Sequence, residues 1–169
     1  VYNQQKVTII VTMKNQSVKN RRCIESILTY CNLDMLELVV VDNYSNDSER
    51  EWVKSQDYLT YVYFDDGEAN FAKMINDTIS ELKIENDFII LDSEFFMKED
   101  IICKINNIIH NNDDIGTVSP LFMCDLYEIL LGRVVDEHLA KEHKNGSTEL
   151  YDVMSTQPYA VYISYGLWN

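Results

Sequence analysis

Short apolar runs alternate with segments of helical periodicity along most of the chain. The first run, residues 7–12, is rich in β-branched side chains and almost wholly apolar, which is typical of a strand covered on both faces. Residues 20–30 then repeat apolar side chains at helical spacing. By the same criteria we predict strands over residues 36–41, 58–64, 88–91 and 115–118, and helices from Asp47 or Ser48 to Val53, from about Ala69 to Leu82, and over residues 101–109.

This alternation predicts an α/β, Rossmann-like fold, a three-layer sandwich with a mostly parallel central sheet. Right-handed crossovers then bring the C-terminal ends of residues 7–12, 36–41 and 88–91 to one edge of the sheet. Ligands of open α/β sheets bind at that edge. We therefore expect the functional residues among the polar side chains that follow these three strands.

The pattern weakens after Pro120, a residue that ends the strand predicted before it. Residues 126–131 and 134–144 have weak helical periodicity. Residues 145–147 are typical of a turn, and residues 159–165 alternate as a strand does. A length of 169 residues fits one domain, so this segment is expected to complete the domain that the earlier elements form.

The formal charge of −14 narrows the classes of possible partner. It argues against a general nucleic-acid-binding protein, which meets phosphate with basic patches, and it disfavours adhesion to anionic lipid. A phosphorylated ligand would need a metal ion, local cations or backbone N–H groups to offset this charge. No apolar run approaches the length of a transmembrane span.

The four cysteines match no zinc-binding spacing. They are expected to be free thiols in a reducing compartment, so we expect a cytoplasmic protein, with peripheral attachment at the inner face of the membrane as the alternative. The cysteines are Cys23, Cys31, Cys103 and Cys124.

Two carboxylates end the apolar run of residues 88–91. Asp92 and Glu94 are separated only by the small residue Ser93. Carboxylate oxygens are suited to Mg²⁺ or Mn²⁺, and these ions in turn bridge phosphate oxygens. The alternative is that both acids only form a turn or cap a helix.

Polar side chains also follow the first two strands. Asp42 can accept a hydrogen bond from the imide of uracil or thymine, or from a ribose hydroxyl, and it can equally form a turn with Asn43. Thr12 and Lys14 lie in a segment whose donors can frame a base or a phosphate, although an exposed lysine is the ordinary case. No glycine-rich dinucleotide-binding or Walker motif is present.

Five segments, in order along the chain, resemble motifs of the family-two glycosyltransferases of the GT-A type. Residues 7–15 resemble the opening strand, residues 39–47 the Val-Val-Asp-Asn/Asp-Gly-Ser-x-Asp motif, and residues 91–94 the Leu-Asp-x-Asp signature. Residues 70–76 resemble the Gly-Phe-Ala-x-Ala-x-Asn helix, and residues 115–120 the strand that comes next. The similarity extends from Val7 to about Pro120.

The resemblance implies a GT-A-type fold and a metal-dependent enzyme that transfers a hexose or deoxyhexose with inversion. Mn²⁺ or Mg²⁺ would be held by Asp92 and Glu94 and would stabilise the leaving diphosphate, while a base deprotonates the acceptor hydroxyl. Residues 70–76 would lie beside the donor, with Lys73 as a phosphate contact, and Thr12 and Asp42 would contact the base or ribose. The full set implied for the donor nucleotide is Thr12, Lys14, Asp42, Asn43, Lys73, Asp92 and Ser93.

The resemblance also implies partners and a division of the chain. The donor would be UDP- or dTDP-linked and the acceptor a glycan or a lipid-linked sugar, as in bacterial polysaccharide biosynthesis; no nucleic acid is expected. Residues 1–120 would form the nucleotide-sugar-binding core, and residues 121–169 a partial acceptor-side segment of the same domain. Additional domains or a homo-oligomer would complete the protein.

Three positions depart from the family pattern. Glu94 stands where an aspartate is usual, and Tyr44 and Asn70 replace glycines, so a left-handed backbone would strain Tyr44. No convincing catalytic base follows Pro120; Asp136, Glu137 and His138 fit an exposed helix face better. A catalytically degenerate domain that acts as a binding or assembly module is therefore the alternative function. A flavodoxin-like or response-regulator-like domain is a third reading, which does not account for residues 71–76.

Overall fold

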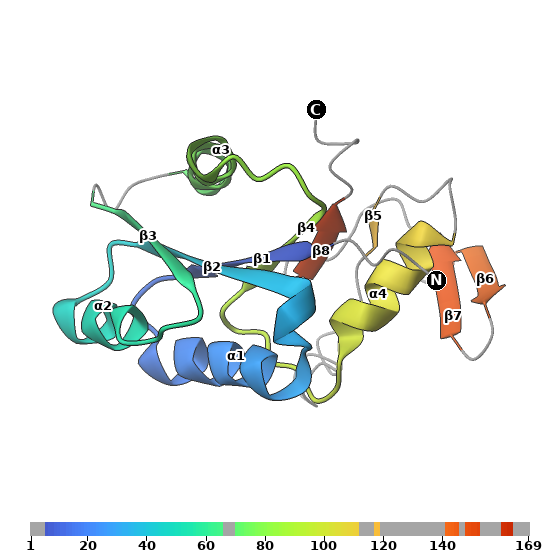
Figure 1. Ribbon diagram of the computed structural model, residues 1–169, viewed down its shortest axis with the longest axis horizontal. Helices are drawn as coiled ribbons and strands as arrows, with labels where there is room; N and C mark the ends of the chain where they lie inside the picture. The colour runs from blue at the N-terminus through green and yellow to red at the C-terminus, as the bar shows by residue number, and fades with distance from the viewer. Residues whose placement is uncertain are drawn as a thin grey trace, which may run out of the picture.

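The computed structural model describes residues 6–65, 70–111, 117–118, 141–145, 148–152 and 160–163, with side chains described over 6–65, 70–107 and at 111. Its centre is a six-stranded sheet with the strand order β3-β2-β1-β4-β8-β5 (Figure 1). Four of these strands form an all-parallel block: β1 (Val7–Met13), β2 (Leu36–Asn43), β3 (Thr60–Phe64) and β4 (Phe88–Asp92). The α/β fold with a mostly parallel sheet is confirmed.

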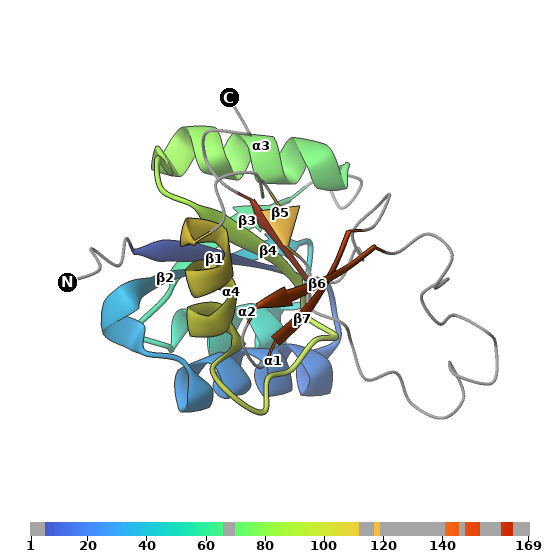
Figure 2. The ribbon, with the colours of Figure 1, turned by 90° about the vertical axis from the view of Figure 1, so that its right-hand side faces the viewer.

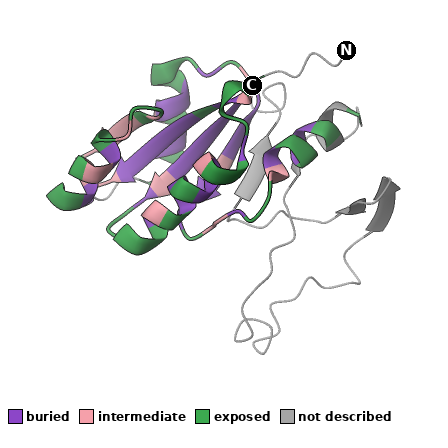
Figure 3. Ribbon diagram, turned by 60° about the horizontal axis from the view of Figure 1, so that its bottom comes forward, coloured by how far each residue is buried: buried purple, intermediate pink, exposed green. Residues whose placement is uncertain are grey.

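Helices cover both faces of the sheet, as Figures 1 and 2 show. The helices α1 (Ser17–Tyr30), α2 (Asp47–Lys54) and α4 (Ile101–His110) lie on one face, and α3 (Phe71–Leu82) lies on the other. Their purple inner faces pack against strands that are buried on both sides (Figure 3). Alternate residues of β1 accordingly belong to different cores: Ile9 packs with α1 and α4, and Ile10 packs with α3.

The ends of two helices differ from the sequence-based expectation. Asn46 caps α2, because its side chain accepts a hydrogen bond from the backbone N–H of Glu49, so neither Asp47 nor Ser48 is the cap. Asn70 caps α3 by accepting from the N–H of Ala72. Both caps lie at the edge of the sheet where the parallel strands end, and they fix where each helix leaves that edge.

The C-terminal part adds short antiparallel strands. β8 (Ala160–Ile163) lies between β4 and β5 (Thr117–Val118), which confirms the strands predicted near both positions. The helix predicted over residues 134–144 is wrong at its end, because β6 (Lys141–Asn145) pairs with β7 (Thr148–Asp152) there. The backbone hydrogen bonds of that hairpin outweigh a weak helical pattern. Residues 126–131 and 136–138 lie outside the described part.

One short element links α1 to β2. The 3-10 helix η1 (Leu33–Met35) begins at Asn32, whose side chain accepts a hydrogen bond from the N–H of Asp34. None of the helices within the described ranges combines the length and the apolar character that a bilayer span requires.

Candidate functional site

The C-terminal ends of β1, β2 and β4 lie side by side, and this places three of the predicted site residues next to one another. In the strand register Thr12 is the partner of Asp92, and Met13 is the partner of Asp42. Because the strands are parallel, the loops that follow them leave the same edge of the sheet. The prediction that the polar residues after these three strands meet at one edge of the sheet is confirmed.

A tight turn orients the two carboxylates after β4. The Asp92 Oδ1 atom accepts a hydrogen bond of 2.8 Å from the N–H of Glu94, and the N–H of Phe95 donates to the carbonyl of Asp92 at 3.0 Å. The N–H of Ser93 donates to the carbonyl of Thr12 at 3.2 Å, which ties the turn to β1. The turn predicted as the alternative is thus present, and it leaves the side chain of Glu94 exposed.

A pocket of about 220 Å³ lies at this edge. Six of the predicted residues line it: Thr12, Lys14, Asn43, Asp92, Ser93 and Glu94. The remaining lining residues are Met13, Gln16, Phe71 and Met74. The polar floor comes from the strand ends and the apolar wall from the first turn of α3.

Asp42 and Lys73 are placed outside the lining of this pocket. Asp42 is fully buried; its Oδ1 accepts from the N–H of Ser45 at 2.9 Å and its Oδ2 from the hydroxyl of Tyr61 at 2.7 Å. Burial first, and then this bond to Asp42, raise the pKa of the Tyr61 phenol. Lys73 forms an ion pair with Asp77 one turn further along α3.

Asn43 offers a hydrogen-bonding atom at the pocket. Its Oδ1 is buried, and no group among the described residues donates a hydrogen bond to it. A buried acceptor without a donor costs about 1–3 kcal/mol, so such atoms call for a physical explanation. A ligand N–H or hydroxyl in the pocket that Asn43 lines would satisfy it.

The donor set at the pocket fits a metal ion that arrives with a ligand. Within the described residues, no cluster of three or more histidine, cysteine or acidic side chains is arranged to hold a metal. Asp92 and Glu94 supply two carboxylates, and Mg²⁺ sites of this kind use one or two carboxylates together with substrate phosphate oxygens and water. The residues present therefore suit a metal–diphosphate complex better than a preformed metal cage.

Lys19 contacts one of these two carboxylates, that of Glu94. It lies in the first turn of α1, and its Nζ forms an ion pair with Glu94 Oε1. Cys23, one turn further along α1, lies close to the carbonyl of Asp92, and burial first and the charge of Asp92 second raise the pKa of its thiol to about 12. The first two turns of α1 thus lie against the turn that carries Asp92 and Glu94.

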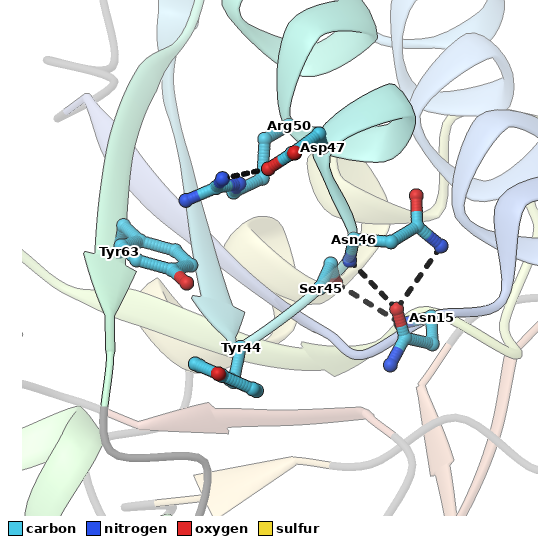
Figure 4. A pocket seen from close by; sticks show the side chains of 7 residues that line it. All are labelled: Asn15, Tyr44, Ser45, Asn46, Asp47, Arg50 and Tyr63. Atoms are coloured by element: carbon cyan, nitrogen blue, oxygen red, sulfur yellow. Dashed lines mark hydrogen bonds and ion pairs between the residues drawn. The ribbon is translucent and has the colours of Figure 1, made fainter.

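A second pocket, of about 330 Å³, is lined by residues that follow β1 and β2 and by residues of α2 and β3 (Figure 4). Polar groups of its wall bond to one another: the Asn15 side chain accepts a hydrogen bond of 2.8 Å from the backbone N–H of Asn46. Its aromatic wall is Tyr44, whose ring lies 6.5 Å from that of Tyr63, with Arg50 over the Tyr63 ring. Tyr44 has φ 63°, so its backbone is left-handed, the conformation in which a non-glycine residue is strained, whereas Asn70 has φ −63° and serves as a helix cap.

Two residues at the site were not anticipated from the sequence: Gln16, which lines the pocket, and Lys19, which pairs with Glu94. Phe71 and Met74 belong to residues 70–76, which the resemblance placed beside the donor. Both line the pocket, and Phe71 is 50% exposed. The available signal was topological, because a helix that follows a parallel strand starts at the C-terminal edge of the sheet and presents its first turn there.

Comparisons with known proteins agree with this architecture. No family model and no curated protein matches the sequence. Among solved structures, the mannosyltransferase PcManGT from Pyrobaculum calidifontis, in complex with GDP-Man and Mn²⁺, matches 74% of this chain with a TM-score of 0.58 and 22% identity. TarS from S. aureus, residues 1–349, matches 94% of the chain with a TM-score of 0.68 and 15% identity, and another TarS structure matches 63% with a TM-score of 0.51 and 20% identity.

These neighbours are GT-A-like glycosyltransferases. The chain has a glycosyltransferase fold. It covers 38% of the mannosyltransferase chain, and 47% and 20% of the two TarS chains. This chain therefore spans less than half the length of each of these three structures.

Proposed function

We propose that this chain is the nucleotide-sugar-binding portion of a metal-dependent, inverting glycosyltransferase. The observation that carries the proposal is the joint placement of Asp92 and Glu94 at the end of β4, in one pocket with Thr12, Lys14 and Asn43. A bound Mn²⁺ or Mg²⁺ would stabilise the negative charge of a leaving diphosphate. The acceptor would be a glycan or a lipid-linked sugar.

Each residue has a part in this proposal. Thr12 and Asn43 bind the base or ribose, and Asn43 Oδ1 is the acceptor for a ligand N–H or hydroxyl. Asp92 and Glu94 hold the metal ion, and Lys14 binds a phosphate oxygen. Asp42 fixes the loop that carries Asn43, and it reaches a base only if the hydroxyl of Tyr61 gives way. Lys73 reaches phosphate only by leaving Asp77.

The specificity follows from what can contact the ligand. The donor is expected to be UDP- or dTDP-linked, because the resemblance at residues 42–43 implies such a donor and because Asn43 Oδ1 can accept the single imide N–H of uracil or thymine. GDP is a necessary competitor in any test, since PcManGT was solved with GDP-Man. The transferred sugar is a hexose or a deoxyhexose, and cytoplasmic polysaccharide biosynthesis is the process that such a reaction serves.

The first prediction concerns binding of the donor nucleotide. We expect one of UDP, dTDP, GDP and CDP at millimolar concentration to raise the melting temperature when Mn²⁺ is present, because a ligand that binds only the folded state stabilises it by mass action. Differential scanning fluorimetry with and without Mn²⁺ measures this shift. Asp92→Ala should abolish it, and Lys6→Gln, which alters the distant pair of Lys6 with Glu37, should leave it unchanged.

A catalytically degenerate binding or assembly module is the second candidate function. Its supporting observation is that Glu94 is engaged by Lys19 rather than left open for a metal ion. The two functions differ in turnover: an enzyme releases free nucleoside diphosphate from a nucleotide sugar in the presence of an acceptor, and a module binds the nucleotide without doing so. Absence of a melting shift with every nucleotide would contradict the proposed donor site itself.

A further inference from the structure

Lys19 and Glu94 form an ion pair between α1 and the turn after β4, across 75 positions of the sequence. Lys19 is 51% exposed and Glu94 45% exposed. An ion pair this exposed contributes little to folding stability, because water screens it and two long side chains lose freedom. Its consequence therefore lies at the pocket that Glu94 lines, and not in the core.

The pair occupies a carboxylate oxygen that a metal ion would need. Glu94 Oε1 contacts the Lys19 ammonium, and Asp92 Oδ1 already accepts the N–H of Glu94. A divalent cation binding at this turn must then displace the ammonium from Glu94 or share the carboxylate with it. Two cations within a few ångströms of each other repel, so both arrangements weaken metal binding.

We propose that Lys19 is a built-in competitor of the divalent cation at Glu94, and that it sets how strongly nucleotide binding depends on metal. The inference rests on the proposed function, because it assigns the same pocket a metal–diphosphate ligand. Without metal, the ammonium neutralises one of the two acids and lowers the repulsion that a diphosphate meets. With metal, the displaced ammonium lies beside the diphosphate, where it forms a second positive contact.

The opposite edge of the sheet supplies a matched control. Lys6 and Glu37 form a similar pair, with an Nζ–Oε1 distance of 3.2 Å and exposures of 49% and 54%. Lys6 precedes β1 and Glu37 lies near the start of β2, so this pair is at the other end of the strands from the pocket. Lys6→Gln removes the same charge from the molecule without touching Asp92 or Glu94.

The test measures Mn²⁺ alone, by the loss of its free electron paramagnetic resonance signal, in wild type, Lys19→Gln, Lys19→Arg and Lys6→Gln. We expect Lys19→Gln to bind Mn²⁺ about thirtyfold more tightly, the factor for removing a unit charge about 4 Å from a divalent ion in water. Lys19→Arg, which keeps the charge, should resemble wild type, and so should Lys6→Gln. Melting temperatures report whether each variant is folded.

The results separate this inference from the proposed function. Equal Mn²⁺ affinity in wild type and Lys19→Gln, including no binding by either, overturns the inference, as does an equal gain in Lys6→Gln. Nucleotide stabilisation of the wild type then decides the proposed function by itself. A gain in Mn²⁺ affinity in Lys19→Gln without any nucleotide binding would support the competitor role and refute the donor site.

A second arm uses the nucleotides without metal. Lys19→Gln should lose whatever metal-free stabilisation UDP or GDP gives to the wild type, and should recover it when Mn²⁺ is added. A variant that keeps its metal-free shift would show that Lys19 does not compensate the acidic turn, and would overturn the inference.

Discussion

At the scale of single residues, two side chains stand where the backbone has the left-handed conformation that favours glycine. Tyr44 and Lys83 both have positive φ, 63° and 52°, although neither is a glycine. Tyr44 keeps contacts with the ring of Tyr63, which offset its strain. Lys83 is exposed and ends α3 in the left-handed conformation that glycine adopts without steric cost.

Lys83→Gly should therefore stabilise the fold. We expect the free energy of unfolding to rise by about 0.5–1 kcal/mol, because the left-handed penalty is removed and the greater freedom of the unfolded glycine offsets part of the gain. Urea denaturation followed by circular dichroism measures the change. Lys83→Ala retains the Cβ atom and should show no gain; equal stabilisation by both variants would mean that the lysine itself, and not its φ, is unfavourable.

At the scale of elements, asparagine caps place the helices that border the pocket. Asn70 has the extended conformation of a cap and accepts from the N–H of Ala72 at 2.9 Å, and the next residue, Phe71, lines the pocket. The resemblance places a glycine at this position. Asn70 adds a capping hydrogen bond that glycine could not make, and its φ of −63° does not require a glycine. The start of α3 is thus fixed by one side chain.

Loss of the Asn70 cap should destabilise α3. Asn70→Ala is expected to lower the free energy of unfolding by about 1 kcal/mol, since the first turn of the helix loses an acceptor for one of its free N–H groups. Asn70→Asp keeps an acceptor at the same place and should remain close to wild type in urea denaturation. If alanine and aspartate behave alike, the bond to Ala72 does not define the helix start.

At the scale of the whole molecule, the two thiols of α1 and its C-terminal end report on the integrity of the larger core. Cys23 and Cys31 are buried in the cluster that joins α1, α4 and the sheet, whereas Cys103 is exposed. Burial raises the pKa of both buried thiols to about 12; nearby Asp92 and Asp100 add to the effect at Cys23 and Cys31 respectively. Burial and protonation both suppress reaction, since the thiolate is the nucleophile.

Alkylation by iodoacetamide should distinguish these thiols. At pH 8 a thiol of pKa about 12 is ionised in about one molecule in ten thousand, so Cys23 and Cys31 should remain unmodified in the native protein while Cys103 reacts. Since the folded-state pKa values are raised, the suppression weakens as the pH rises towards 12. Peptide mass spectrometry locates the label, and early labelling of Cys23 at pH 8 would contradict the packing of α1 against β4. In urea, both thiols should become reactive together with global unfolding.

The alternation of buried runs and helical repeats was enough to predict the parallel sheet of β1, β2, β3 and β4, because strands covered on both faces are apolar throughout and their crossover helices are amphipathic. The same rule predicted that Thr12, Asp42 and Asp92 would meet at one edge, since it follows from strand direction alone. The sequence also indicated turn formation and ligand binding as alternative roles of Asp92 and Glu94. The structure shows that the two roles are compatible, because these residues form the turn and also line the pocket.

Which side chains face the pocket and which stabilise the fold depends on contacts between elements that are far apart in the sequence. Asp42 is engaged by Tyr61 from a neighbouring strand, and Glu94 by Lys19 from α1; both partners are distant in sequence, so no local pattern reveals them. The hairpin of β6 and β7 was missed for the same reason, because its stability comes from bonds between strands and not from the periodicity of either one. The short-range hydrophobic pattern and the direction of the chain were enough to predict the layers of the fold and the edge of the sheet where a ligand is expected. The pairing of each charge at that edge depends on contacts that exist only once the chain has folded.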